Sequence, residues 1–180
     1  SNLRAQQARL ALLAGDSGTA QQWLRAEAPD ETGSFIILDR YGYMTKLRLY
    51  LAENKMTEFS YLVNRMLQYY RAYQRPYGQA ECLLLTAIAR YRQHKNNWCS
   101  ALKEAMAICE RYQLVRLVAD EGEAALMLTE YLQPDTPYRT AVLEAVCTQA
   151  QRYPAYLASQ QMERQTLTEM EREVFRLMAV

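Results

Sequence analysis

Apolar residues recur along almost the whole chain at intervals of three and four, which is the period of an amphipathic helix. In the region 59–70 the apolar positions of one predicted face are Phe59, Leu62, Val63, Met66, Leu67 and Tyr70. A second run, in the region 98–112, consists of Trp98, Ala101, Leu102, Ala105, Ile108, Cys109 and Tyr112. The pattern predicts helices that each bury one face in a shared core.

Short polar turns come before the clearest of these helices, at Gly15, at Asn54 and in the stretch 94–97. Gly and Asn tolerate the left-handed backbone conformation that closes a helix. Gly15 and Asn54 are 39 residues apart, and Asn54 and Asn96 are 42 apart. A two-helix unit of about 40 residues is typical of an α-solenoid. We therefore predict an all-α fold, an α-solenoid of three to four tetratricopeptide-like helical hairpins.

The repeats agree at positions that the turns do not dictate. When the turns are aligned, one shared position holds Leu24, Val63 and Ala105, and another holds Ala20, Phe59 and Ala101. A fourth, less regular hairpin is predicted over 117–131 and 138–153, with a turn at 134–137. A terminal repeat is expected to be atypical because its outer face meets solvent or another domain.

Composition and charge narrow the class of partner. The chain has only 6 Gly and 5 Pro, and it carries 21 Lys and Arg against 20 Asp and Glu, a net charge of +1. Such a balance provides no field that attracts nucleic acid or an anionic membrane. No apolar stretch approaches the roughly 20 residues of a membrane helix, and the N-terminus lacks the pattern of a signal peptide. We predict a cytoplasmic protein without a membrane partner.

Residues that carry chemistry are sparse. His94 is the only histidine, and it lies in a polar turn with no nucleophile motif nearby, so we expect it to be solvated. There is no phosphate-binding glycine motif. The four cysteines have no metal-ligand spacing and are predicted to be reduced core thiols: Cys82, Cys99, Cys109 and Cys147. We expect this segment to have no enzyme activity, no cofactor and no metal site.

One set of charged residues follows the repeat. With the spacings of 39 and 42, Arg9, Arg48 and Arg90 fall at the same position of successive first helices. In a tetratricopeptide-like array that position faces the concave groove, where three arginines would suit a carboxylate, a phosphate or an acidic peptide. Alternatively, each arginine pairs with an acid of the adjacent hairpin or lies in solvent. Neighbouring acids such as Asp120 and Glu121 are expected to be solvated or to cap helices.

Tyrosine is abundant, with 14 in the chain, and several lie close together in the region 61–77. Tyr73 and Tyr77 are candidates for the same groove because a phenol combines a flat apolar face with a hydrogen-bonding end. Packing between helices explains these two residues equally well. Tyr70 is predicted to belong to the core.

The last fourteen residues form a helix-start pattern. Thr168 can cap the helix, Glu171 completes a capping box three residues later, and Val174 begins an apolar face. The stretch 167–180 also resembles the opening of the LuxR-type helix-turn-helix, which begins L-T-x-R-E-x-E-V-L. The residues that match are Leu167, Thr168, Glu171, Glu173 and Val174, whereas Met170 replaces the family's arginine and Phe175 its last leucine.

A second resemblance covers the repeats. The stretch 8–16, with Ala20, Trp23 and Leu24, is similar to repeats in the MalT-like branch of the LuxR family, and 115–122 resembles a later part of that sensor. These regulators carry an ATPase module, a helical-repeat sensor and a C-terminal DNA-binding domain. The resemblance implies a sensor over 1–157, followed over 158–180 by a linker and the first helix of that DNA-binding domain.

The resemblance also implies a role. A sensor of this kind binds an unknown small-molecule effector or protein partner and controls the attached helix-turn-helix, and DNA is reached only through that motif. The alternative is a tetratricopeptide-like adaptor that recognises peptides and has no small-molecule ligand. Self-association is left open by the sequence.

Overall fold

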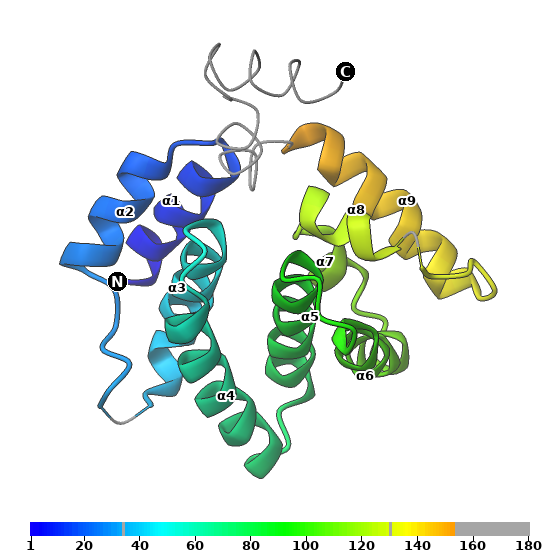
Figure 1. The fold of residues 1–180 in the computed structure, drawn as a ribbon, viewed down its shortest axis with the longest axis horizontal. Helices are drawn as coiled ribbons and strands as arrows, with labels where there is room; N and C mark the ends of the chain where they lie inside the picture. Colours follow the sequence, from blue (N-terminus) through cyan, green and yellow to red (C-terminus); the bar gives the residue numbers. More distant parts are fainter. Residues whose placement is uncertain (34, 130, 154–180) are drawn as a thin grey trace, which may run out of the picture.

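The computed structural model describes residues 1–33, 35–129 and 131–153. Its elements are α1 (Asn2–Leu13), α2 (Ser17–Ala26), the 3-10 turn η1 (Ile37–Asp39), α3 (Arg40–Ala52), α4 (Met56–Ala72), α5 (Pro76–Arg92), α6 (Trp98–Arg111), α7 (Val115–Ala119), α8 (Glu123–Thr129) and α9 (Pro137–Arg152). Every regular element in these ranges is helical, which confirms the all-α prediction (Figure 1). The predicted motif at Thr168, Glu171 and Val174 and the boundary at 157 lie outside the described residues.

Helices that follow one another in sequence pack against one another. Figure 1 shows α1 and α2 on one side, α3 to α6 in the middle, and α7 to α9 on the other side. We call α1–α2, α3–α4 and α5–α6 the first, second and third hairpins. The helix α5 contacts α4 and α6 and also meets α3, α7 and α8, so it lies at the centre of the arrangement.

The helices of the three hairpins are closed by one recurring turn. Gly15, Asn54, Gln74, His94 and Gln113 all adopt positive φ angles, between 50° and 82°. In each case the amide of the next residue donates to a carbonyl five residues earlier in the sequence, at 2.8–3.0 Å. This left-handed closure satisfies carbonyl groups that the end of a helix leaves without partners. The turns predicted at 15 and 54 are confirmed, and the exposed His94 lies in a turn as expected.

The third hairpin has a longer internal turn than the other two. Its closing residue, His94, follows Asn54 by 40 residues, but α6 begins 42 residues after α4. Three residues separate α3 from α4, and five separate α5 from α6. The alignment of the second helices therefore keeps the predicted spacing, whereas the first helices follow the closing residue and shift by two.

This shift corrects the predicted arginine stripe. Arg9 and Arg48 each lie six residues before the positive-φ residue of their turn. The residue six positions before His94 is Ile88, so Arg90 does not share their position. The prediction of three equivalent arginines is wrong because the extra residues of the third turn follow His94 rather than precede it.

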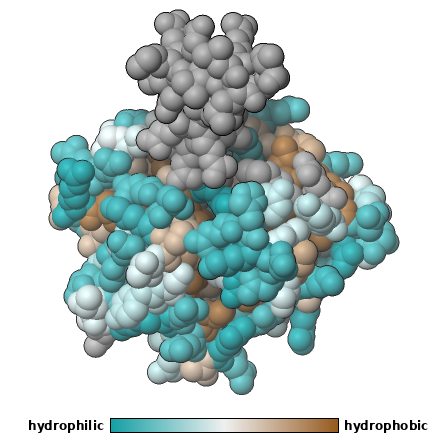
Figure 2. All heavy atoms as spheres, in the orientation of Figure 1, coloured by the Kyte–Doolittle hydropathy of each residue, from teal (hydrophilic) through white to brown (hydrophobic). Residues whose placement is uncertain are grey.

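The first helices are buried more completely than the second helices. Residues 42–51 of α3 are buried on all sides, and so are most residues of α5 between 78 and 89. The predicted apolar face of α4 is confirmed as core except for Leu67, which is half-buried. On α6 the predicted face is mostly buried, but Tyr112 is exposed at its end. Hydrophilic residues cover most of the face shown in Figure 2.

Two expectations about the sequence need correction here. The four cysteines are free thiols, but Cys99 is half-buried and Cys147 is exposed, so only Cys82 and Cys109 are core residues. Burial raises the pKa of Cys109 to about 12, so its thiol stays protonated. The first helix predicted for the fourth hairpin is broken into α7 and α8, because Gly122 adopts φ +54° between them.

The helices do not have the character of membrane spans. In the three ranges that the structure describes, none is both long enough and apolar enough to cross a bilayer.

Candidate functional site

The break between α7 and α8 places an acid inside the molecule. Glu121 precedes Gly122 in this break, and only 1% of its surface is exposed. This burial contradicts the expectation that Glu121 is a solvated surface residue or a cap. A buried carboxylate requires positive partners and hydrogen-bond donors, because it has lost its water.

Arg48 of α3 provides most of those donors. Its side chain is 2% exposed, and its Nε lies 3.0 and 3.1 Å from the two carboxylate oxygens of Glu121. Its Nη2 contacts Glu121 as well and donates to Oε1 of Glu81 at 2.9 Å, while Nη1 donates to the carbonyl of Met44 at 3.0 Å. All three nitrogens of the guanidinium are thus used, which is what a stable buried charge pair needs.

Two further arginines complete the group. Nη2 of Arg9, on α1, lies 3.6 Å from Oε1 of Glu121 and 3.5 Å from the carbonyl oxygen of Asp120. Nη2 of Arg40, at the start of α3, donates to Oε2 of Glu81 at 2.5 Å. We call this group the charge cluster and define it as Arg9, Arg40, Arg48, Glu81 and Glu121.

The electrostatics of the cluster favour the ionised acids. Burial alone would raise the pKa of Glu81, but the attraction of Arg48 and Arg40 outweighs burial, so this pKa lies below its usual range. Glu81 is therefore charged at neutral pH. Because guanidinium groups occupy the oxygens of both carboxylates, the cluster is suited to holding elements together rather than to accepting protons.

The cluster joins parts of the chain that are far apart in sequence. Arg9 comes from the first hairpin, Arg48 from the second, Glu81 from the third, and Glu121 from the turn after α7. The contact between Arg9 and the carbonyl of Asp120 spans 111 positions. The sequence gave a signal for Arg48, through the repeat, but none for Glu121, whose neighbours look like an ordinary polar turn.

The structure separates the predicted groove arginines. Arg48 and Arg9 pair with acids of other elements, which is the alternative that the sequence left open. Arg90 lies near the end of α5, where its Nη1 is 3.4 Å from the carbonyl of Asn97. A single groove lined by all three arginines is not formed.

The two candidate tyrosines lie near the α4–α5 turn. Tyr73 is 62% exposed and packs its ring on Tyr69 at 4.5 Å between centroids. Tyr77 is 47% exposed, and the guanidinium of Arg40 lies 4.7 Å above its ring centre. Tyr70 is fully buried, as predicted. A role of Tyr73 or Tyr77 in binding stays a prediction.

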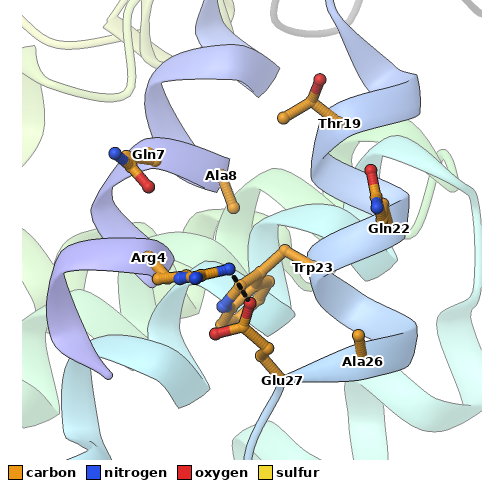
Figure 3. Close-up of a pocket in the computed structure, with 8 residues that line it drawn as sticks. All are labelled: Arg4, Gln7, Ala8, Thr19, Gln22, Trp23, Ala26 and Glu27. Atoms are coloured by element: carbon orange, nitrogen blue, oxygen red, sulfur yellow. Dashed lines mark hydrogen bonds and ion pairs between the residues drawn. The ribbon is translucent and has the colours of Figure 1, made fainter.

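A small polar pocket of about 180 Å³ opens between the two helices of the first hairpin. Figure 3 shows Arg4 and Gln7 on α1 facing Gln22 and Trp23 on α2. At one end Nη1 of Arg4 lies 2.7 Å from Oε1 of Glu27. The indole nitrogen of Trp23 is buried and has no hydrogen-bond partner among the described residues.

A larger depression of about 580 Å³ lies between the α4–α5 turn and the second half of α6. Its charged residues include Arg71 and Glu104, whose side chains pair at 2.8 Å, and Arg111. Both members of the pair are about half exposed, so solvent screens their attraction.

A comparison of the chain with protein-family models, with curated proteins and with solved structures found no match. The family resemblance in the sequence therefore stays a prediction. Function is inferred below from the chain's own residues and geometry.

Proposed function

We propose that this chain is the regulatory input module of a bacterial LuxR-family transcription regulator. The module is a tetratricopeptide-like α-solenoid that binds an effector or a partner protein and controls an attached helix-turn-helix. The pattern at 167–180 supports the link to that family. The recurring left-handed turns at Gly15, Asn54 and His94 support the solenoid, because they repeat at nearly equal spacing.

The observation that carries the proposal is the charge cluster. An input module must pass a local binding event to distant elements, and coupling requires an element that both sites bias. Arg9 links α1 to Glu121, and the turn that holds Glu121 leads into α8, which packs on α9. A ligand that moves the first hairpin therefore changes the contacts that position the last described helices.

Binding without chemical conversion fits the same geometry. The carboxylates of the cluster are paired with arginines, and neither is placed to act as a general base. Residues 42–51 of α3 are buried, so we propose that a ligand approaches the hairpins from their outer surfaces rather than along this helix. We propose no cofactor for the module and place it in the cytoplasm.

The test is a promoter reporter in the native host, carrying the whole gene to which this segment belongs. The variant Arg9→Gln removes the link between α1 and Glu121 but leaves Arg48 paired. We expect its output to respond much less to inducing conditions at an unchanged protein level. The control is Arg4→Gln, also on α1, because Arg4 pairs only within the first hairpin region, with Glu27. A full response in Arg9→Gln, or a reading frame that ends at Val180, contradicts the proposal.

The class of ligand is tested on the isolated chain by thermal shift with metabolites and with peptides. A ligand present at 100 times its dissociation constant adds about 2.7 kcal/mol of stability. Stabilisation by metabolites supports the input module. Stabilisation by peptides alone supports the alternative role as an adaptor.

A further inference from the structure

The long turn of the third hairpin forms one wall of a pocket of about 190 Å³, which we call the turn pocket. The other walls come from the first half of α4 and the last turns of α5. Phe59 and Val63 of α4 form an apolar side, and the polar side includes Arg90, Lys95 and Asn97. This volume lies below the roughly 300 Å³ at which sites for drug-sized ligands begin, so the pocket suits a small ligand.

The charge of the turn pocket is not neutralised locally. Arg90 and Lys95 both line it, and none of the described residues that line it is acidic. Neither side chain makes an ion pair within the described parts of the chain, and Arg90 makes only the long contact with the carbonyl of Asn97. Two cations at one pocket repel each other, and an anion between them removes that cost.

The second hairpin shows what neutralisation looks like at the same place. Its turn contains Lys55, which corresponds to Lys95, and Nζ of Lys55 lies 2.6 Å from Oε2 of Glu53. The residue that corresponds to Glu53 in the third hairpin is Gln93, which lines the turn pocket. The third hairpin thus has the lysine without the acid, and it adds Arg90 beside it.

The surroundings strengthen the attraction for an anion. The apolar side of the turn pocket lowers the local dielectric, which makes charge-assisted hydrogen bonds stronger. Asn97 stands immediately before α6, a helix of 14 residues whose first turn has no acid and no side-chain cap. The positive end of that helix adds to the field of the two side chains.

We infer that the turn pocket binds an oxyanion, the phosphate or carboxylate group of a small molecule, with Arg90 and Lys95 as its charged donors. The amide side chains of Asn64 and Gln93 line the same pocket and supply neutral donors. The inference rests on the proposed input role only for calling the bound anion an effector. Anion binding itself is measured independently of transcription.

The experiment is a titration of the chain with inorganic phosphate and, separately, with succinate. Ionic strength is held constant with sodium chloride, and the backbone amide signals of residues 93–97 are followed by NMR. We expect saturable shifts for at least one of the two anions, and the stronger of the two identifies the group that the pocket prefers. Arg90→Gln and Lys95→Gln each weaken binding on the order of tenfold, the loss of one charge-assisted contact.

Two further variants make the test specific. Gln93→Glu restores the acid found in the second hairpin, and we expect it to abolish saturable binding while the melting temperature is kept. Arg71→Gln removes a cation of similar exposure from the depression beside α6, and we expect binding to stay unchanged. Shifts that stay linear for both anions, or equal loss in Arg71→Gln and Arg90→Gln, overturn the inference. The Arg9→Gln reporter judges the input role separately.

Discussion

The charge cluster and the turn pocket both use residues of α5, and they treat positive charge in opposite ways. In the cluster, Glu81 and Glu121 hold Arg48 inside the molecule, and the guanidinium is fully hydrogen bonded. In the turn pocket, Arg90 and Lys95 line a cavity that offers no acid among the described residues. A neutralised arginine holds elements together, whereas one without an acidic partner is available to a ligand.

The largest effect is expected from removing the central arginine of the cluster. Arg48→Ala leaves Glu81 and Glu121 buried without their shared partner, and breaking a buried pair costs about 3–5 kcal/mol. Urea denaturation measures the free energy of unfolding. The matched variant Arg90→Ala is expected to stay within about 0.5 kcal/mol of the parent chain. Similar losses in the two variants would show that the two regions do not differ as described.

A smaller loss is expected when α5 is pushed away from α4. A Cβ at Gly78 would lie 2.6 Å from the buried ring of Tyr70, so Gly78→Ala forces the helices apart and costs about 1–3 kcal/mol. Both regions are then disturbed, because α5 carries Glu81 and Arg90. Gly18→Ala is the control, since the nearest atom is 3.5 Å away and alanine favours the helix. A stable Gly78→Ala variant would argue against this packing of α5.

The cluster also predicts how stability depends on pH. The pKa of Glu81 is lower in the folded chain than in the unfolded chain, where a glutamate titrates near 4.3. The stabilisation is therefore fully present above that pH and is lost as the pH falls through the folded pKa. Denaturation at a series of pH values below 5 should show this fall, and Glu81→Gln should flatten it. An unchanged slope in Glu81→Gln would mean that other carboxylates control acid unfolding.

The smallest effect is expected at the exposed pair of Arg71 and Glu104. Solvent screens this pair, and exposed ion pairs contribute about 0–1 kcal/mol. Arg71→Gln should shift the urea midpoint only slightly, and sodium chloride should remove the remaining difference. A loss comparable to that of Arg48→Ala would mean that exposure does not separate the two kinds of pair.

The helices were predictable because each depends on a local pattern. The apolar face at Phe59, Leu62 and Val63 requires only the helical period, and it is buried as expected. Gly15 and Asn54 mark turns because their backbones accept the left-handed conformation. Gln74 and Gln113 adopt it as well, and glutamine gives no signal for such a turn in a sequence.

The candidate site depended on relations that are not local. Burial of Glu121 follows from the break at Gly122 and from arginines on two distant helices. The misplaced equivalence of Arg90 followed from counting the two extra residues of the third turn before His94 rather than after it. Spacing measured between turns sums over insertions, and only backbone geometry shows where an insertion lies.

Native-state hydrogen exchange in Arg9→Gln tests most directly whether the cluster couples the first hairpin to the last helices. If the cluster acts in this way, amides of α8 and α9 lose protection although the changed residue is on α1, because the contacts of Arg9 near Glu121 are gone. In the control Arg4→Gln, the loss should stay within α1 and α2. Unchanged exchange of α8 and α9 in Arg9→Gln would contradict the coupling.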